Sequence, residues 1–264
     1  MDKKALIVIP ARMASTRFPN KPLALIQGKT MIERVWKIGK AVGHLADVVI
    51  ATDDESLRDF AEGFGASVVM TSSNLLTGTD RVAEASHKYP EHSIFFSLQG
   101  DAVLTPPWVI SDVLKVMIAN PSIQIATPAV RLTGTALIEF LESKKGGNSS
   151  GTTVTFDKNG NALYFSKSVI PYDRDELNPN RIVYRHIGLY GYRKEILQLL
   201  SQLEETPFES SEKLEQLRAL ENGIPIRVVE VDYKGRTHGS VDRLEDIAIV
   251  EAIIKKEGEL ISCV

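Results

Sequence analysis

The sequence predicts an α/β protein with a mostly parallel sheet flanked by helices and a smaller antiparallel β-rich region in the second half. In the first hundred residues, short β-branched and aromatic runs alternate with segments of helical spacing, which is typical of βαβ units. After residue 125, strand-like runs lie close together around a tight-turn signal at Asn159-Gly160. The 264 residues, 43% of them hydrophobic, can bury the core of one large domain, 1–264.

The strands expected in the first half are short continuous apolar runs, which indicates burial on both faces. They cover residues 5–9, 48–51, 67–70 and 94–98, and the helices between them cover 31–42, 54–63 and 79–88. In a Rossmann-like sheet of this kind, ligands bind beyond the carboxyl ends of the strands. The loops 10–22, 52–55, 71–80 and 99–107 are therefore expected to hold the chemistry.

The second half is expected to contain antiparallel strands over 126–132, 152–156 and 162–165, and a further strand near 186–192. Helical spacing predicts helices over 194–203 and 211–222. A last buried strand over 227–232 precedes a terminal helix over 243–257. These patterns divide the domain into the regions 1–125, 126–225 and 226–264.

The composition argues against several classes of protein. A net charge of −3 supplies no global positive field, so nucleic acid is not an expected partner. The single cysteine, Cys263, allows neither an intrachain disulfide nor a cysteine-based zinc site, which fits a reducing compartment. The N-terminal apolar run is too short for a signal peptide, and no apolar stretch approaches the roughly 20 residues that span a bilayer. We therefore expect a cytoplasmic protein without a membrane partner.

The loop after the first strand carries three cations, Arg12, Arg17 and Lys21, among hydroxyl side chains. Cations and free backbone N–H groups together can neutralise and hold a triphosphate. Three such residues in a loop are more often a solvated basic surface. Their position at the mouth of the first strand favours phosphate binding instead.

The string I-P-A-R-x-x-S-T-R-x-P-x-K-P-L, from Ile9 to Leu23, resembles the opening of CMP-Kdo synthetases, the 3-deoxy-manno-octulosonate cytidylyltransferases. These enzymes share the nucleotide-diphospho-sugar transferase type of fold. The resemblance continues in collinear order over nearly the whole chain. It runs through ATDDE (51–55), VMTSSNLLTGTDRVAEA (69–85), LQGD (98–101), ALYFSKSVIPYDRD (162–175), YRHIGLYGYR (184–193), EKLEQLRALENG (212–223) and VDRLEDI (241–247).

The resemblance implies an enzyme that transfers CMP from CTP to an acidic sugar, with Mg²⁺ as cofactor. It implies a CTP-binding half (1–125), a sugar-binding and dimerisation region (126–225) and a metal-ligand loop with the C-terminal helix (226–264). The implied catalytic residues are Arg12, Lys21, Asp101 and Asp242, the last two also binding the metal. The implied nucleotide-binding residues are Pro10, Ala11, Arg12, Ser15, Thr16, Arg17, Lys21, Met70, Thr71, Ser72, Thr79, Arg81 and Gln99. The implied sugar-binding residues are Lys167, His186, Tyr190, Glu215 and Gln216.

The positions of Asp101 and Asp242 in the sequence also indicate a metal site, independently of the resemblance. Asp101 directly follows a buried strand and Asp242 follows a short polar loop, so each can present an oxygen ligand. Magnesium prefers a few carboxylates together with substrate phosphates and water. A lone Asp after a strand is more often a turn residue, and only the family pattern raises these two above that alternative. His186 is equally open to a structural role.

Three positions depart from the family pattern, and all fall near the implied sugar site. The usual Q-G-D-E-P continues here as Ala102-Val103 after Asp101, which loses a carboxylate. The segment 148–155 loses a lysine, and Lys167 replaces the arginine usual after Tyr-Phe-Ser. A lysine cannot reproduce the bidentate contact of arginine with a carboxylate. The acceptor is therefore expected to be Kdo or a modified, for instance amino-substituted, relative of it.

Two alternatives remain open from the sequence. One is a related transferase that uses another acid, such as a sialic-acid-like sugar, or another nucleotide. The other is a noncatalytic nucleotide-binding protein, against which the retention of Asp101 and Asp242 argues. A homodimer is expected from the resemblance, through the antiparallel region.

Overall fold

The computed structural model describes residues 5–14, 18–147, 150–175, 178 and 181–261. In these residues a ten-stranded sheet has the order β5-β4-β1-β6-β11-β7-β10-β8-β9, with β12 paired to β7. Strands β1, β4, β5 and β6 are mutually parallel, while β11, β7, β10, β8 and β9 pair antiparallel in succession. The predicted α/β class, with a parallel half and an antiparallel half, is confirmed.

The strands of the first half occur where the sequence predicts them, within about two residues. The elements of this half are β1 (Ala5–Pro10), the short helix η1 (Lys21–Leu23), β2 (Leu25–Ile26), β3 (Lys29–Thr30), α1 (Met31–Lys40), η2 (Gly43–Leu45), β4 (Ala46–Thr52), α2 (Glu55–Gly63), β5 (Ser67–Met70), α3 (Gly78–His87), β6 (Ile94–Ser97) and α4 (Pro107–Ala119). The helix α4 and the β2-β3 hairpin were not predicted.

The second half differs more from the prediction. Its elements are β7 (Ile125–Leu132), α5 (Gly134–Lys145), β8 (Thr152–Phe156), β9 (Ala162–Ser166), β10 (Val183–His186), β11 (Tyr190–Arg193), α6 (Lys194–Leu200), α7 (Pro207–Glu212), α8 (Gln216–Glu221), β12 (Ile226–Glu230) and α9 (Asp246–Glu257). The single helix expected over 211–222 is wrong. Lys213 takes left-handed backbone angles and separates α7 from α8, which the Glu209–Arg218 ion pair then ties together.

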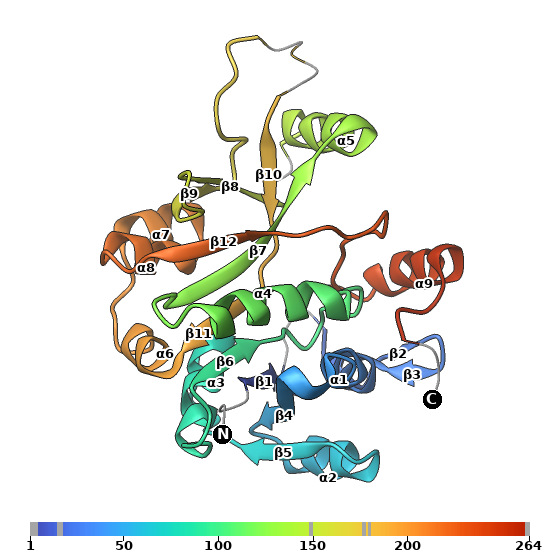
Figure 1. Ribbon diagram of the computed structural model, residues 1–264. Helices are drawn as coiled ribbons and strands as arrows, with labels where there is room; N and C mark the ends of the chain where they lie inside the picture. The colour runs from blue at the N-terminus through green and yellow to red at the C-terminus, as the bar shows by residue number, and fades with distance from the viewer. Residues whose placement is uncertain (1–4, 15–17, 148–149, 176–177, 179–180, 262–264) are drawn as a thin grey trace.

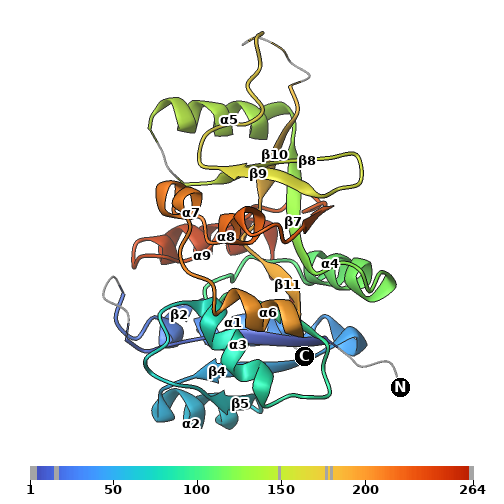
Figure 2. The same cartoon turned by 90° about the vertical axis from the view of Figure 1, so that its left-hand side faces the viewer.

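Strand β1 shows why its sequence is continuously apolar. Ile7 and Ile9 pack into a core with α1, α4 and α9, whereas Leu6 and Val8 pack into a second core with α3, α6 and α8. Each face of the parallel half is therefore covered by helices, as Figures 1 and 2 show. The antiparallel strands β8, β9 and β10 and helix α5 form the opposite end of the molecule (Figure 1).

Two features of this architecture determine where a site can form. The parallel strands β1, β4 and β6 end at one edge of the sheet, and the loops that follow them share that edge. The segment after β12 returns across the molecule and meets the loop after β6, where the Val241 N–H donates to the Asp101 carbonyl at 3.3 Å. Among the described residues, every helix is too short or too polar to cross a bilayer.

Candidate active site

A cleft opens at the edge where β1 and β6 end. Eight of the residues implied by the sequence line it together, namely Pro10, Ala11, Arg12, Lys21, Arg81, Gln99, Asp101 and Asp242. Its remaining lining comes from Pro22, Leu75, Leu76, Thr77, Gly78 and Gly100. Residues from four separate parts of the chain thus share one open space.

Gly100 explains how the loops after β1 and β6 come so close. A Cβ at position 100 would lie 2.9 Å from the backbone carbonyl oxygen of Pro10, closer than carbon and oxygen can pack. Only glycine therefore lets Gln99 and Asp101 stand beside the end of β1.

We expect Gly100→Ala to separate these two loops and to lower the free energy of unfolding by about 1–3 kcal/mol, the usual effect of forced overpacking. Gly63→Ala is the matched control, because a Cβ there meets no atom within 4 Å. Chemical denaturation of both variants tests the expectation. Equal stability of the two would mean that the loops are not held by this contact.

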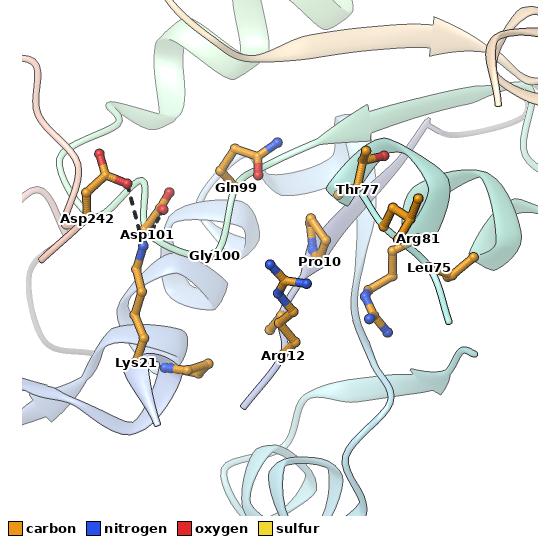
Figure 3. A pocket seen from close by; sticks show the side chains of 14 residues that line it. Pro10, Arg12, Lys21, Leu75, Thr77, Arg81, Gln99, Gly100, Asp101 and Asp242 are labelled. Atoms are coloured by element: carbon orange, nitrogen blue, oxygen red, sulfur yellow. Dashed lines mark hydrogen bonds and ion pairs between the residues drawn. The ribbon is translucent and has the colours of Figure 1, made fainter. Parts of the chain in front are cut away.

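One wall of the cleft carries an ion cluster of Lys21, Asp101 and Asp242. The Lys21 Nζ lies 2.6 Å from Asp101 Oδ2 and 3.9 Å from Asp242 Oδ1 (Figure 3). The backbone N–H groups of Asp242 and Arg243 both donate to Asp246 Oδ2 at 2.8 Å, which holds the turn before α9. Two carboxylates that are 141 positions apart in the sequence therefore face one cation.

This donor set fits a magnesium ion. The described residues contain no group of three or more His, Cys, Asp or Glu side chains placed to hold a metal. Two carboxylates alone suit Mg²⁺, which takes its remaining ligands from substrate phosphates and water. That one ammonium is held by both side chains shows that Asp101 and Asp242 already converge on a positive charge.

The opposite wall of the cleft is cationic. Arg12 is exposed at the end of β1, and its side chain lies between Lys21 and the α3 side of the cleft in Figure 3. Arg81 is only 3% exposed; its guanidinium donates to Thr71 Oγ1 and lies 3.4 Å from Asp53 Oδ1. Because Arg81 is anchored in this way, its charge is held in place on this wall.

Helix α3 begins at the cleft with a capping box. The Thr77 hydroxyl accepts from the Asp80 N–H at 3.0 Å, and the Asp80 carboxylate accepts from the Thr77 N–H at 3.1 Å. The helix starts next to Gln99, which a Cβ at Gly78 would touch at 3.4 Å. Thr77, Leu75 and Leu76 were missed from the sequence, although the T-x-x-D spacing from Thr77 to Asp80 is a recognisable helix start.

Four implied nucleotide-binding residues do not line this cleft. Thr71 is buried against Arg81, the Met70 carbonyl accepts from Lys88, and the Ser72 N–H donates to Glu84. The Thr79 side chain hydrogen-bonds with Glu215 and Tyr192. The positions 15–17 (Ser15, Thr16 and Arg17) lie outside the described residues.

Tyr190, Glu215 and Gln216, which the resemblance assigns to the sugar, meet in a small second pocket with Tyr192 and Arg218. Burial raises the pKa of the Glu215 carboxyl, which a hydrogen bond from Thr79 partly offsets. The Gln216 Nε2 is buried and has no hydrogen-bond partner among the residues that the structure describes. This pocket and the first cleft lie on either side of the first turn of α3.

His186 and Lys167 do not line either pocket. The His186 Nε2 lies 2.9 Å from Thr127 Oγ1, and its ring packs against Phe165 and Tyr190. The Lys167 N–H donates to Glu212 Oε2 at 2.8 Å. Of the departures from the family pattern, Ala102 and Val103 are buried in the core rather than exposed in the cleft. The positions 148 and 149 lie outside the described residues.

His186 makes the stability depend on pH. Burial, and to a lesser extent the nearby His238, lowers the pKa of His186 to about 3 from 6.5. Below pH 6.5 His186 is protonated in the unfolded chain but stays neutral in the folded protein. The free energy of unfolding should therefore fall by about 1.4 kcal/mol for each unit by which the pH is lowered, as the contribution of this residue. The loss ends near pH 3, where the folded state is protonated too.

The His186→Gln variant is expected to show a shallower fall, measured as urea denaturation across this pH range. Burial lowers the pKa of His238 to about 4, so this second histidine also makes the free energy of unfolding fall as the pH is lowered, and its contribution remains in the variant. A slope identical to that of the parent protein would show that His186 is not buried in its neutral form.

Comparison with known proteins agrees with the site. Residues 6–230 match the family model described as "Cytidylyltransferase". A 3-deoxy-manno-octulosonate cytidylyltransferase from Maricaulis maris is 52% identical over 259 residues, covering 97% of this chain and 99% of that protein. The mitochondrial 3-deoxy-manno-octulosonate cytidylyltransferase of Arabidopsis thaliana is 35% identical, covering 94% of this chain and 82% of that protein.

A solved structure extends the likeness to three dimensions. It is the CMP:2-keto-3-deoxy-manno-octonic acid synthetase complexed with CTP, which matches with a TM-score of 0.85 and 36% identity over 96% of this chain and 99% of that one. The family match, the near full-length relatives and the shared fold lead to one conclusion. This chain belongs to the cytidylyltransferase family and is a nucleotidyltransferase.

Proposed function

We propose that the protein transfers CMP from CTP to the anomeric hydroxyl of Kdo or a closely related acidic sugar and releases pyrophosphate, with Mg²⁺ as cofactor. The observation that carries this proposal is the convergence of Asp101 and Asp242 on one cation, opposite the Arg12 side chain. The choice of Kdo as the acceptor is supported by the relatives that are named as 3-deoxy-manno-octulosonate cytidylyltransferases.

The residues of the cleft have different roles in the proposed reaction. Arg12 and Lys21 hold the triphosphate and neutralise the pyrophosphate leaving group. Asp101 and Asp242 would hold Mg²⁺, which supplies charge stabilisation at the α-phosphate and lowers the pKa of the attacking hydroxyl. The sugar oxygen forms the new bond to the α-phosphorus while the bond to the β-phosphate oxygen breaks, and its proton passes to solvent. No covalent intermediate with the protein is required.

Lys21 has a second part in this scheme. Without nucleotide its ammonium serves as counter-ion to both carboxylates. With a divalent cation on the two carboxylates, the Lys21 ammonium would be available to bind phosphate oxygens of the nucleotide. Arg81 and the capped start of α3 would contact the nucleotide from the opposite wall.

Pyrophosphate release in the presence of CTP, Mg²⁺ and Kdo tests the proposal directly. We expect turnover with CTP and none with other nucleoside triphosphates. Thermal shifts report nucleotide binding independently, because a ligand at 100 times its Kd adds about 2.7 kcal/mol. CTP binding without pyrophosphate release from any sugar acid would favour a noncatalytic nucleotide-binding protein.

A modified acceptor is the second candidate, and it rests on the differences from the family pattern at Ala102 and Lys167. Ala102 is buried in the core and Lys167 lines neither pocket, so this candidate rests on the sequence pattern and not on a contact within the site. Amino-substituted Kdo should then be used at least as well as Kdo. Kdo turnover that exceeds that of every modified acid would remove this candidate.

We also propose a homodimer formed through the antiparallel end. Strand β9 is the last strand of the sheet, and Leu163 on it is 64% exposed. An exposed apolar edge of this kind favours pairing with a second chain. Light scattering after size exclusion tests it, and a monomer at micromolar concentration would contradict it.

A further inference from the structure

The last helix, α9, is joined to segments near the N-terminus by contacts that span 224 and 225 positions of the sequence. Just beyond its end, Glu259 accepts from Arg34 on α1 at 2.8 Å and 3.1 Å, which makes a bidentate pair. The Gln27 N–H, in the turn between β2 and β3, donates to Glu251 Oε1 on α9 at 2.8 Å. We call these two contacts the α9 clasp, and Figure 1 shows α9 beside the β2-β3 hairpin.

The Arg34 side of the clasp is rigidly held. Arg34 is 7% exposed, and its guanidinium also donates to the carbonyls of Ile26 at 2.7 Å and Gln27 at 3.4 Å. A bidentate pair of guanidinium and carboxylate fixes orientation as well as distance. The clasp therefore fixes the end of α9 against the hairpin that follows η1, the short helix that begins with Lys21.

The segment that carries Asp242 is attached to both ends of the same helix. Near the C-terminal end of α9, Glu257 accepts from the Thr237 N–H at 3.1 Å with each of its carboxylate oxygens. At the N-terminal end, Asp246 Oδ2 accepts from the Asp242 N–H at 2.8 Å. The segment 237–246 and the 12 residues of α9 therefore form one closed unit, and a shift of α9 would carry Asp242 with it.

Asp242 depends on this unit for its position. Its side chain is 57% exposed, against 26% for Asp101 in the loop after β6. Its Oδ1 lies 3.9 Å from Lys21 Nζ, at the outer limit of an ion pair. The buried Val241, whose N–H donates to the Asp101 carbonyl, is one further anchor of the segment. Because a shift of about 1 Å in a catalytic group can cost about 10²-fold in rate, the attachment of α9 bears directly on the metal site.

We propose that Arg34 and Glu259 are positioning residues that hold the Asp242 carboxylate, through α9, at the spacing from Lys21 and Asp101 that a divalent cation needs. This assignment rests on the proposed function. Arg34 and Glu259 line a small separate cavity between α1 and α9 and are not among the described residues that line the cleft. They therefore act on the distance between the two carboxylates and not on the substrates. Outer contacts of this kind, which orient metal ligands, typically affect metal affinity by about 10- to 100-fold.

Glu259→Gln is the first test, read as the Kd for Mg²⁺ rather than as activity. Mg²⁺ is titrated calorimetrically into protein that is in excess over CTP, without an acceptor, so that all nucleotide is bound and no turnover occurs. The amide keeps the size of the side chain but loses the charged bidentate contact. We expect the Kd for Mg²⁺ to rise about 10-fold.

Glu209→Gln is the matched control. Glu209 forms a bidentate pair with Arg218 at 2.5 Å and 2.8 Å, and this pair joins α7 to α8, far from α9 in Figure 1. Both variants lose a partly buried ion pair, so both should have a lower Tm. Only Glu259→Gln should bind Mg²⁺ more weakly. An equal change in the Kd for Mg²⁺ in both variants, or an unchanged Kd in Glu259→Gln, would overturn the proposal.

The second contact of the clasp allows rescue by a conservative variant. Glu251→Ala removes the acceptor of the Gln27 N–H but keeps a residue that favours the helix, so the fold should be retained. Its Kd for Mg²⁺ should rise in the same direction as that of Glu259→Gln. Glu251→Gln keeps an oxygen that can accept from the same N–H and should stay within about twofold of the parent protein. Equal Kd values for the two Glu251 variants would contradict a role of this contact in positioning.

Combination with Asp242→Asn separates positioning from general destabilisation. If the clasp acts through Asp242, adding Glu259→Gln to Asp242→Asn should change the Kd for Mg²⁺ by less than about twofold, since coupled residues are not additive. A further rise as large as in the parent background would overturn the proposal, because the clasp would then act by another route.

Failure of the proposed function would be seen separately, as absence of pyrophosphate release from the parent protein with CTP, Mg²⁺ and Kdo. The Mg²⁺ titrations need no acceptor, so a tenfold difference between Glu259→Gln and Glu209→Gln would still support the clasp in that case. A parent protein that binds no Mg²⁺ in the presence of CTP would overturn it, because there would be no metal for Asp242 to hold.

Discussion

Asp101→Asn is expected to lower kcat on the order of 10³-fold, the size of effect seen when one preorganised electrostatic group is removed from an active site. The amide keeps the shape of the side chain but removes the charge that a divalent cation needs. The apparent affinity for Mg²⁺ should fall in parallel, so raising the Mg²⁺ concentration should recover part of the activity. Pyrophosphate release over a range of Mg²⁺ concentrations measures both effects.

Asp112→Asn is the matched control for this variant. Asp112 lies on α4 and forms an exposed pair with Lys115 at 3.5 Å, outside the cleft. Its neutralisation should leave kcat and the Mg²⁺ requirement unchanged, because exposed ion pairs contribute little. If Asp101→Asn retained activity close to that of Asp112→Asn, Asp101 would not be a metal ligand.

Lys21→Met is expected to lower kcat/KM for CTP by about 10²- to 10³-fold, since the variant loses a cation that neutralises the leaving pyrophosphate. Its effect on Mg²⁺ should be opposite to that of Asp101→Asn. In the free protein the Lys21 ammonium occupies the space between Asp101 and Asp242 and competes with any other cation. Without it, the two carboxylates should bind Mg²⁺ more tightly in the absence of nucleotide.

Titration calorimetry with Mg²⁺ alone checks this second effect of Lys21→Met, and Lys115→Met serves as control. Lys115 is 62% exposed and its partner Asp112 lies outside the cleft, so Mg²⁺ binding should not change. Weaker Mg²⁺ binding to Lys21→Met than to the parent protein would show that the ammonium does not compete for the same carboxylates.

The parallel half of the fold was predictable because its strands are covered on both faces. Alternate residues of β1 enter two different cores, so every position must be apolar and the run is visible in the sequence. Helix α4 was missed because Ser111, Asp112 and Lys115 are its only polar residues, and a polar face this narrow gives a weak helical period in the sequence. The break between α7 and α8 depends on the backbone of Lys213, which propensity does not indicate.

The site was predictable only in part, for a related reason. Residues after parallel strands must share one edge, so the loop order alone places Arg12, Lys21 and Asp101 together. Thr79 lies at the start of α3 and was expected to bind the nucleotide, but its side chain hydrogen-bonds with Glu215 and Tyr192. Which side of a helix turn faces the cleft depends on the packing of the second half against α3, and no local pattern records that.

The sequence by itself determined the fold class, the family and the loop chemistry of this protein. Strands buried on two faces appear in the sequence as continuous apolar runs, and the loops that follow them appear as short local motifs. Only the tertiary structure decided that Asp101 and Asp242 face the same Lys21 ammonium and that the Thr79 side chain bonds to Glu215 and Tyr192. These contacts join segments that the chain separates by tens of residues. Their geometry depends on how the sheet twists and how its two halves pack, which is a property of all the contacts at once.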